Sequence, residues 1–173
     1  MTFSIRTIIR DLVASECRLS CPRNLWVGGL AELRRRGAGR RESGAFLLGT
    51  RAERLRRIQR FVYYDDLDPH CLDRGYVVFD GAGYGPLWDL CRKTGLEVVA
   101  DVHTHPGAPF QSGADRMHPM VAVKGHIALI VPDFAKRVFQ PHELGIYEYE
   151  GGHRWGNHSG GKGGKFFYIG TWG

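Results

Sequence analysis

The side chains best suited to chemistry stand at the end of one short apolar run and just beyond it. Residues 98–106 read VVADVHTHP, a β-branched segment that ends in two histidines and a proline. Side chains alternate along a strand, so His103 and His105 would point to the same face, close enough to bind one metal ion as neutral imidazoles. Ser112 and Asp115 follow as S-x-x-D, a spacing typical of the first turn of a helix.

These residue types favour a catalytic metal site over a structural one. His103, His105 and Asp115 would supply three nitrogen or oxygen ligands, which leaves one tetrahedral position open for water. A bound zinc ion can lower the pKa of water from about 15.7 towards about 7, so that hydroxide forms at neutral pH. The pattern therefore indicates hydrolysis. Two histidines on a strand are also common without a metal, so the hypothesis depends on the whole set of residues.

Glu42 begins another apolar run, in which residues 42–49 read ESGAFLLG directly after a basic loop. Spacing along the chain does not by itself bring this carboxylate to the histidines. A family resemblance does. The order E-x-G-x-x-L-x-G, H-T-H-P and S-x-x-D resembles the JAMM metallopeptidases, a zinc deubiquitinase-like family also called JAB or MPN. The resemblance spans residues 18–150, and the compact size looks like that of the bacterial members.

The resemblance implies a role for each of five residues. Glu42 would be the general acid/base, and Ser112 would help to stabilise the tetrahedral oxyanion. The zinc ligands would be His103, His105 and Asp115. The loop between the second histidine and the serine is one residue shorter than in the usual family pattern, which bears on the direction of the serine hydroxyl.

The activity implied by the resemblance is that of a zinc-dependent isopeptidase or peptidase. Such an enzyme uses zinc-activated water to cleave a ubiquitin-like protein from a conjugate or to trim its C-terminal tail. Its partners would be the ubiquitin-like protein and the associated activating or conjugating enzymes, including those of bacterial antiviral defence. Two alternatives stay open: a zinc hydrolase that processes a sulfur-carrier protein or a small amide, and a zinc-free MPN scaffold protein. The intact ligand set argues against the scaffold.

The elements that must position these residues mix helices and strands without strict alternation. This predicts an α/β or α+β fold with a largely antiparallel or mixed sheet. The family implies a curved mixed β-sheet flanked by helices, with a cytidine-deaminase-like architecture. We expect a helix capped by Asn24 that ends near Gly37, a helix at 86–94, and strands at 18–22, 43–50, 55–64, 76–79, 96–105, 126–131, 145–150 and 165–169. The glycine-rich segment 151–164 is expected to be a flexible loop.

The chain has 173 residues, 43% of them hydrophobic, which suits one domain at residues 16–173. Residues 1–15 form a predicted amphipathic helix outside that domain, with an apolar stripe made of Ile5, Ile8, Ile9, Leu12 and Val13. Charged residues interrupt it, so it reads neither as a signal peptide nor as a membrane span. The four cysteines form no C-x-x-C pair, which favours reduced thiols and a cytoplasmic location.

The net charge of +6 is unevenly distributed, because residues 1–60 hold 14 arginines. A run such as residues 34–36 is usually a solvated helix face, and no aromatic residues are interleaved with these arginines to stack bases. We therefore expect no nucleic-acid partner. Residues 81–85 and 156–162 each lack positions that nucleotide-binding loops require, so no nucleotide cofactor is expected.

Overall fold

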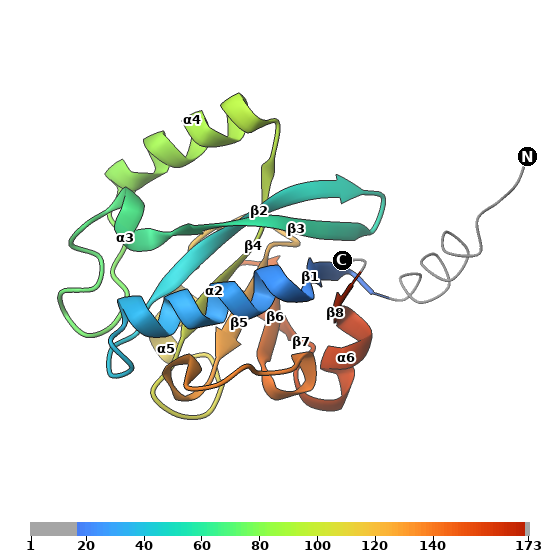
Figure 1. The fold of residues 1–173 in the computed structure, drawn as a ribbon. Helices are drawn as coiled ribbons and strands as arrows, with labels where there is room; N and C mark the ends of the chain where they lie inside the picture. The colour runs from blue at the N-terminus through green and yellow to red at the C-terminus, as the bar shows by residue number, and fades with distance from the viewer. Residues whose placement is uncertain (1–16, 172–173) are drawn as a thin grey trace, which may run out of the picture.

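The structure, a computed structural model, describes residues 17–171, which form one eight-stranded sheet flanked by helices (Figure 1). The strand order is β7-β6-β5-β4-β2-β3-β1-β8. The strands are β1 (Leu19–Pro22), β2 (Gly44–Ala52), β3 (Leu55–Tyr63), β4 (Glu97–Thr104), β5 (Ile127–Val131), β6 (Gly145–Gly151), β7 (Arg154–Asn157) and β8 (Phe167–Gly170). The helices are α2 (Arg23–Arg36), α3 (Tyr64–Leu67), α4 (Tyr84–Thr94), α5 (Gly113–Met117) and α6 (Gly163–Phe166).

The sheet is mixed. Strand β1 runs parallel to β3 and β8, and β4 runs parallel to β5. The pairs β2–β3, β2–β4, β5–β6 and β6–β7 are antiparallel. The predicted class, a curved mixed sheet flanked by helices, is confirmed, as Figure 1 shows.

Strand β2 lies in the middle of the sheet and is covered on both faces. Ala45 and Leu47 belong to a core that includes side chains of α2, whereas Phe46 and Leu48 belong to a second core that includes Leu87 of α4. All five side chains are fully buried. A strand buried on both faces reads as a continuous apolar run, which explains the sequence pattern after Glu42. Both cores therefore pack against β2, which begins two residues after Glu42.

Helix α2 packs as predicted but begins differently. Trp26, Leu30 and Leu33 face the core. The predicted cap by Asn24 is wrong, because Pro22 occupies the N-cap position and no side chain makes a capping hydrogen bond. Strand β1 runs directly into the helix through this proline, whose fixed φ suits the junction. The predicted end of the helix at Gly37 is confirmed.

The sequence predicts that the arginines at the end of α2 form a solvated face, but one of them is largely buried. The Arg36 side chain is 14% exposed and lies 2.7 Å from carboxylate oxygens of both Asp65 and Asp66. Its guanidinium also lies over the Tyr63 ring, 4.1 Å from the ring centre. Arg36 therefore joins α2 to α3, whereas Arg35 stays exposed.

The strand predicted at 76–79 is wrong. The backbone N–H of Val78 donates to the carbonyl of Cys71, and that of Val77 donates to the Glu42 carboxylate. These hydrogen bonds go to a turn and to a side chain, so no neighbouring strand completes a ladder. The residues have the β-propensity of a strand, but pairing partners decide whether a strand forms.

The flexible loop predicted at 151–164 is also wrong in part, because strand β7 lies within it and pairs with β6. Gly151 and Gly152 have φ of +90° and +58°, which lets the chain turn tightly between the two strands. Trp155 then packs edge-on against Tyr149, with ring centres 4.9 Å apart. Gly151 and Gly152 therefore form the turn of a β-hairpin.

The amphipathic helix predicted for residues 1–15 falls outside the described residues and stays a prediction. Within residues 17–171, no helix combines the length and the apolar character that crossing a membrane requires.

Candidate metal centre

The two histidines lie at the C-terminal end of strand β4, and the neighbouring strands β2 and β5 hold that end in place. His103 pairs with Gly44 of β2 and with Ile130 of β5. His105 lies one residue beyond the strand, yet its N–H donates to the carbonyl of Val131 at 2.9 Å. The chain therefore stays extended through the second histidine, and the alternation of side chains brings both rings to one side.

Helix α5 presents Asp115 through the predicted capping box, which the structure contains. The Ser112 oxygen accepts a hydrogen bond from the Asp115 N–H at 3.1 Å, and the Ser112 N–H donates to Asp115 Oδ2 at 2.6 Å. Two reciprocal bonds thus hold the carboxylate in a fixed direction. Ser112 itself is exposed, and its oxygen is engaged as the helix cap.

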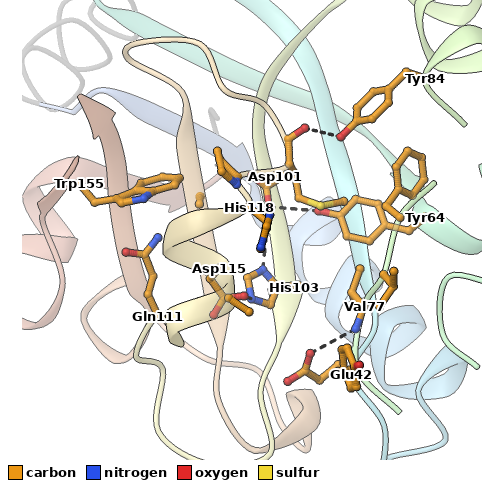
Figure 2. Close-up of a pocket in the computed structure, with 17 residues that line it drawn as sticks. Glu42, Tyr64, Val77, Tyr84, Asp101, His103, Gln111, Asp115, His118 and Trp155 are labelled. Atoms are coloured by element: carbon orange, nitrogen blue, oxygen red, sulfur yellow. Dashed lines mark hydrogen bonds and ion pairs between the residues drawn. The ribbon is translucent and has the colours of Figure 1, made fainter. Parts of the chain in front are cut away.

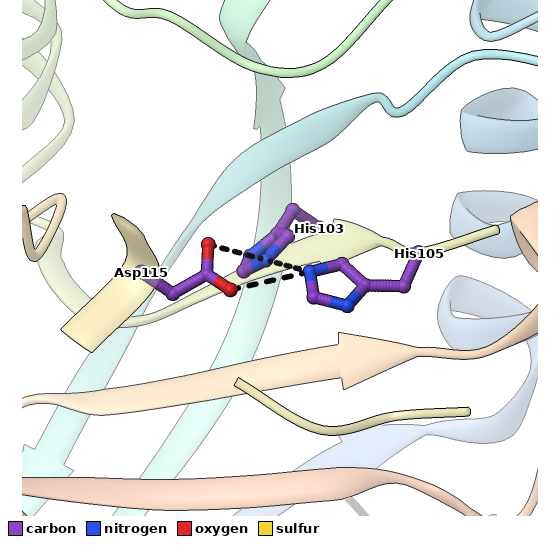
Figure 3. Close-up of side chains that lie close together, drawn as sticks. All are labelled: His103, His105 and Asp115. Carbon is purple, nitrogen blue, oxygen red and sulfur yellow. Dashed lines mark hydrogen bonds and ion pairs between the residues drawn. The ribbon is translucent and has the colours of Figure 1, made fainter. Parts of the chain in front are cut away.

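The side chains of His103, His105 and Asp115 converge, as Figure 3 shows. The two histidine Nε2 atoms are 3.0 Å apart. Asp115 Oδ1 lies 3.4 Å from His103 Nε2, and Asp115 Oδ2 lies 3.3 Å from His105 Nε2. Two imidazole nitrogens and one carboxylate oxygen are the donors that catalytic zinc sites use while one position stays open. The donor set fits the predicted metal, and the ligand roles remain predictions.

The carboxylates around His103 favour positive charge at this site. Burial by itself would lower the pKa of His103, but the nearby carboxylates of Asp101 and Asp115 raise it to about 10. Burial would raise the pKa of Asp115, but the two nearby histidines hold it well below its usual range. A proton on His103 therefore supplies the positive charge at this place. Metal ligation needs a neutral imidazole, so a bound cation would displace that proton.

Glu42 lies across the cavity from these residues (Figure 2). Gly44, two residues after Glu42, pairs with His103. The register of β2 therefore brings Glu42 towards the C-terminal end of β4. Its Oε2 accepts a hydrogen bond from the Val77 N–H at 3.4 Å, and its own N–H donates to Gly75 at 3.0 Å. The half-buried carboxylate lines the same cavity as His103. The structure thus brings together residues that sequence spacing alone could not connect.

Residues 30–141 match the family model described as prokaryotic homologs of the JAB domain. The chain belongs to this family. The resemblance inferred from the motifs is therefore confirmed. The matched residues include the candidate metal centre and Glu42, so the family and the geometry concern the same part of this JAB-domain chain.

The JAB-domain chain is also similar to individual proteins. One relative, named "Probable metalloprotease y4jG", is from Sinorhizobium fredii (strain NBRC 101917 / NGR234) and is 30% identical over 63 residues. That match covers 36% of this chain and 39% of the relative, so it spans well under half of that protein. The identity supports a metallopeptidase-like function at a coarse level.

Solved structures extend the likeness to the fold. Protein DSY2949 from Desulfitobacterium hafniense has a TM-score of 0.58 at 16% identity, over 87% of this chain and 92% of that one. A protein from Salinibacter ruber (strain DSM 13855) has a TM-score of 0.48 at 20% identity, over 78% and 82% of the two chains. The first of these likenesses shows a shared fold.

The JAB-domain site also contains a polar cluster that the sequence reasoning missed. Asp101 is 2% exposed, and its Oδ1 lies 2.6 Å from Nε2 of His126. Its Oδ2 accepts a hydrogen bond from the Tyr64 hydroxyl at 3.1 Å and lies 4.0 Å from Nδ1 of His103. The signal in the sequence was a carboxylate inside an apolar strand, two residues before a histidine and thus on its face. The tyrosine and the second histidine had no such signal.

The Asp101 carboxylate is ionised although it is buried. Burial would raise its pKa, but the nearby imidazoles of His103 and His126 lower it. A buried charge is expensive unless it is paired, so these partners are needed to keep it. Metal-ligating histidines commonly direct their other ring nitrogen to a carboxylate, which fixes the ring. Asp101 stands on the Nδ1 side of His103, while Nε2 faces Asp115, and this arrangement suits a residue that orients a ligand.

Proposed function

We propose that this chain is a zinc-dependent peptidase or isopeptidase that cleaves a ubiquitin-like protein from a conjugate or trims its C-terminal tail. The observation that carries the proposal is the convergence of His103, His105 and Asp115, with Glu42 across the same cavity. Family membership and a relative named as a probable metalloprotease support metal-dependent hydrolysis of a peptide bond.

The residues divide the work. His103, His105 and Asp115 would hold the zinc, which when bound supplies a water of lowered pKa and polarises the substrate carbonyl. Glu42 takes a proton from the attacking water and returns it to the leaving nitrogen. The hydrogen bond from Val77 engages one carboxylate oxygen of Glu42, so the other is available for that proton.

Ser112 has a smaller task in this proposal. Its oxygen accepts the N–H of Asp115, and a hydroxyl that accepts one hydrogen bond can still donate another. That hydrogen would be donated to the oxyanion that forms when water adds to the carbonyl, where a donor acts mainly in the transition state. The capping box therefore links a metal ligand and an oxyanion donor in one turn.

A ubiquitin-like substrate fits the surroundings of the site. A flexible tail can be held as an added strand, and small residues let its backbone approach closely. Residues 76–79 border the cavity and belong to no strand of the sheet, so such a tail would lie along them, although the N–H groups of Val77 and Val78 already donate within the chain. The activating and conjugating enzymes of that ubiquitin-like protein are the further partners that the proposal implies.

Cleavage assays test the proposal. The zinc-loaded chain is incubated with a ubiquitin-like protein that has a short C-terminal extension and with its lysine conjugate, and products are identified by intact mass. Cleavage should be lost by about 10² to 10⁴ in Glu42→Gln. The matched control Glu53→Gln, in the exposed β2–β3 turn, should keep the wild-type rate.

Two outcomes would contradict the proposal. One is a wild-type chain that contains zinc but cleaves neither substrate, and the other is a Glu42→Gln variant as active as the control. Cleavage of an extended sulfur-carrier protein in place of both substrates would favour the alternative hydrolase.

A further inference from the structure

The cavity beside the candidate metal centre is large enough for more than water. Its volume is about 390 Å³, within the range of about 300–1,000 Å³ that is typical of small-molecule sites. Glu42, His103 and Asp115 line one part of it (Figure 2). The remainder is walled mainly by aromatic and apolar side chains, among them Tyr64, Tyr76, Phe79, Tyr84, Met120 and Trp155.

The aromatic side chains of the wall pack against one another and against the protein core. The Tyr64 and Phe79 rings are 5.5 Å apart between centres, and the Phe79 and Tyr84 rings are 5.0 Å apart. Tyr64 is fully buried, and Phe79 and Tyr84 pack against the same core as Leu87. The wall is therefore continuous with the second core and keeps its shape without a ligand.

The polar atoms of these rings are already engaged within the protein. The Tyr64 hydroxyl donates to Asp101, and the Tyr84 hydroxyl donates to the carbonyl of Met120. On the opposite side, the indole N–H of Trp155 donates to the carbonyl of Arg116 at 3.1 Å. Tyr84 and Trp155 consequently offer the cavity their apolar ring surfaces, whereas the fully buried Tyr64 supports the wall from behind.

Away from the metal ligands, the side chains around the cavity do not favour an anionic ligand group. Among the described residues that line it there is no lysine or arginine, and the acidic side chains of Asp101 and Asp115 both contribute to the wall. A carboxylate or phosphate would find no cationic side chain there apart from the metal and its histidines. An uncharged apolar group loses nothing in this environment and gains from leaving water.

We propose that this cavity binds one large apolar side chain of the substrate, on a residue that adjoins the scissile bond. The inference rests on the proposed function, because the bond is the one attacked beside His103 and Asp115. The substrate is then a peptide tail with a bulky apolar residue, such as leucine or phenylalanine, on one side of the cleaved bond. Small residues on the other side still allow the backbone to approach closely.

Two hydroxamic acids distinguish binding in the cavity from binding to the metal. Acetohydroxamic acid has a metal-binding head and only a methyl group, whereas 3-phenylpropanohydroxamic acid has the same head and a phenyl group on a short arm. Both are titrated calorimetrically into the zinc-loaded chain. The phenyl compound should bind about tenfold to a hundredfold more tightly, as expected for the burial of one large apolar group.

A pair of matched variants then tests whether the tighter binding of the phenyl compound depends on the cavity. Val78 lines the cavity and is 42% exposed, so Val78→Asp introduces a charge into the wall at a site that tolerates it. Val123 is 63% exposed and does not line the cavity, so Val123→Asp is the same change elsewhere. Val78→Asp should lose most of the preference for the phenyl compound while acetohydroxamic acid binds within about twofold of wild type. Val123→Asp should keep the preference.

The outcomes distinguish this inference from the proposed function. If acetohydroxamic acid binds but the phenyl group adds nothing, or if the preference survives in Val78→Asp, the assignment of the cavity is overturned and the metal site stands. If the chain takes up no zinc, the proposed function fails and this inference fails with it.

Discussion

Replacement of Asp101 by asparagine tests whether a buried carboxylate orients a metal ligand. The change keeps the size of the side chain and removes its charge. Asp101 is 2% exposed, accepts a hydrogen bond from Tyr64, and lies 2.6 Å from His126 and 4.0 Å from the Nδ1 atom of His103. A neutral amide still fills the space but interacts more weakly with both histidines. The orientation of His103 should therefore loosen.

The expected magnitude follows from these contacts. Hydrogen bonds to charged groups contribute about 1.5–3 kcal/mol, so Asp101→Asn should lower the free energy of unfolding of the metal-free chain by about that amount. Loss of a carboxylate behind a metal-bound histidine typically lowers metal affinity about 10- to 100-fold. Zinc affinity is measured by competition with a chelator, and stability by urea unfolding of the metal-free chain.

The control is Tyr64→Phe, which removes another partner of the same carboxylate but leaves the contact with His103 in place. It should cost about 1 kcal/mol of stability and change zinc affinity by less than about threefold. A cobalt-loaded Asp101→Asn variant should also show an altered absorption spectrum if the ligand has moved. The reasoning is refuted if Asp101→Asn binds zinc as tightly as wild type, or if both variants weaken zinc equally.

Three further changes follow from the same geometry. Ser112→Ala should slow turnover by about 10² to 10³ with nearly unchanged KM, because an oxyanion donor acts in the transition state; wild-type activity would show that the shorter loop turns the hydroxyl away. Zinc affinity should rise about tenfold per pH unit between about pH 7 and pH 9, because a pKa of about 10 keeps a proton on His103 in the metal-free site. A zinc affinity that does not change with pH would contradict this competition between zinc and the proton. The same raised pKa of His103 stabilises the chain without zinc below about pH 6.5, and that contribution is lost as the pH rises towards 10. Gly44→Ala should lower stability by about 1–3 kcal/mol in urea unfolding, since the added Cβ would clash with the buried Tyr64 ring and with the Val102 carbonyl, and an unchanged midpoint would show that both the ring and the backbone can adjust.

Local patterns predicted much of the fold and of the site. The β-branched run that ends in H-T-H-P became β4, and the S-x-x-D spacing became a capping box, because both depend on residues close together in the chain. The continuous apolar run after Glu42 became β2, since burial on both faces leaves a direct mark on the sequence. The five candidate residues were found in this way, with a family resemblance to connect Glu42 to the rest.

Long-range pairing was beyond such patterns. Tyr64 and His126 meet Asp101 across 37 and 25 residues of chain, and no spacing rule connects them. Residues 76–79 have strand-like composition but no partner strand within residues 17–171, and β7 lies in a segment whose glycines form a turn. Trp155 therefore reaches the cavity from a strand that the composition of its segment concealed.

The central claim is that His103, His105 and Asp115 hold one catalytic zinc and that Glu42 acts beside it without binding it. Elemental analysis of the purified chain, its His103→Ala variant and its Glu42→Gln variant tests this most directly, with each protein reconstituted in zinc and then dialysed. About one zinc per chain is expected for wild type and for Glu42→Gln, and almost none for His103→Ala. A wild-type chain that retains no zinc would contradict the account, and equal loss of zinc from both variants would make Glu42 a ligand rather than the proton carrier.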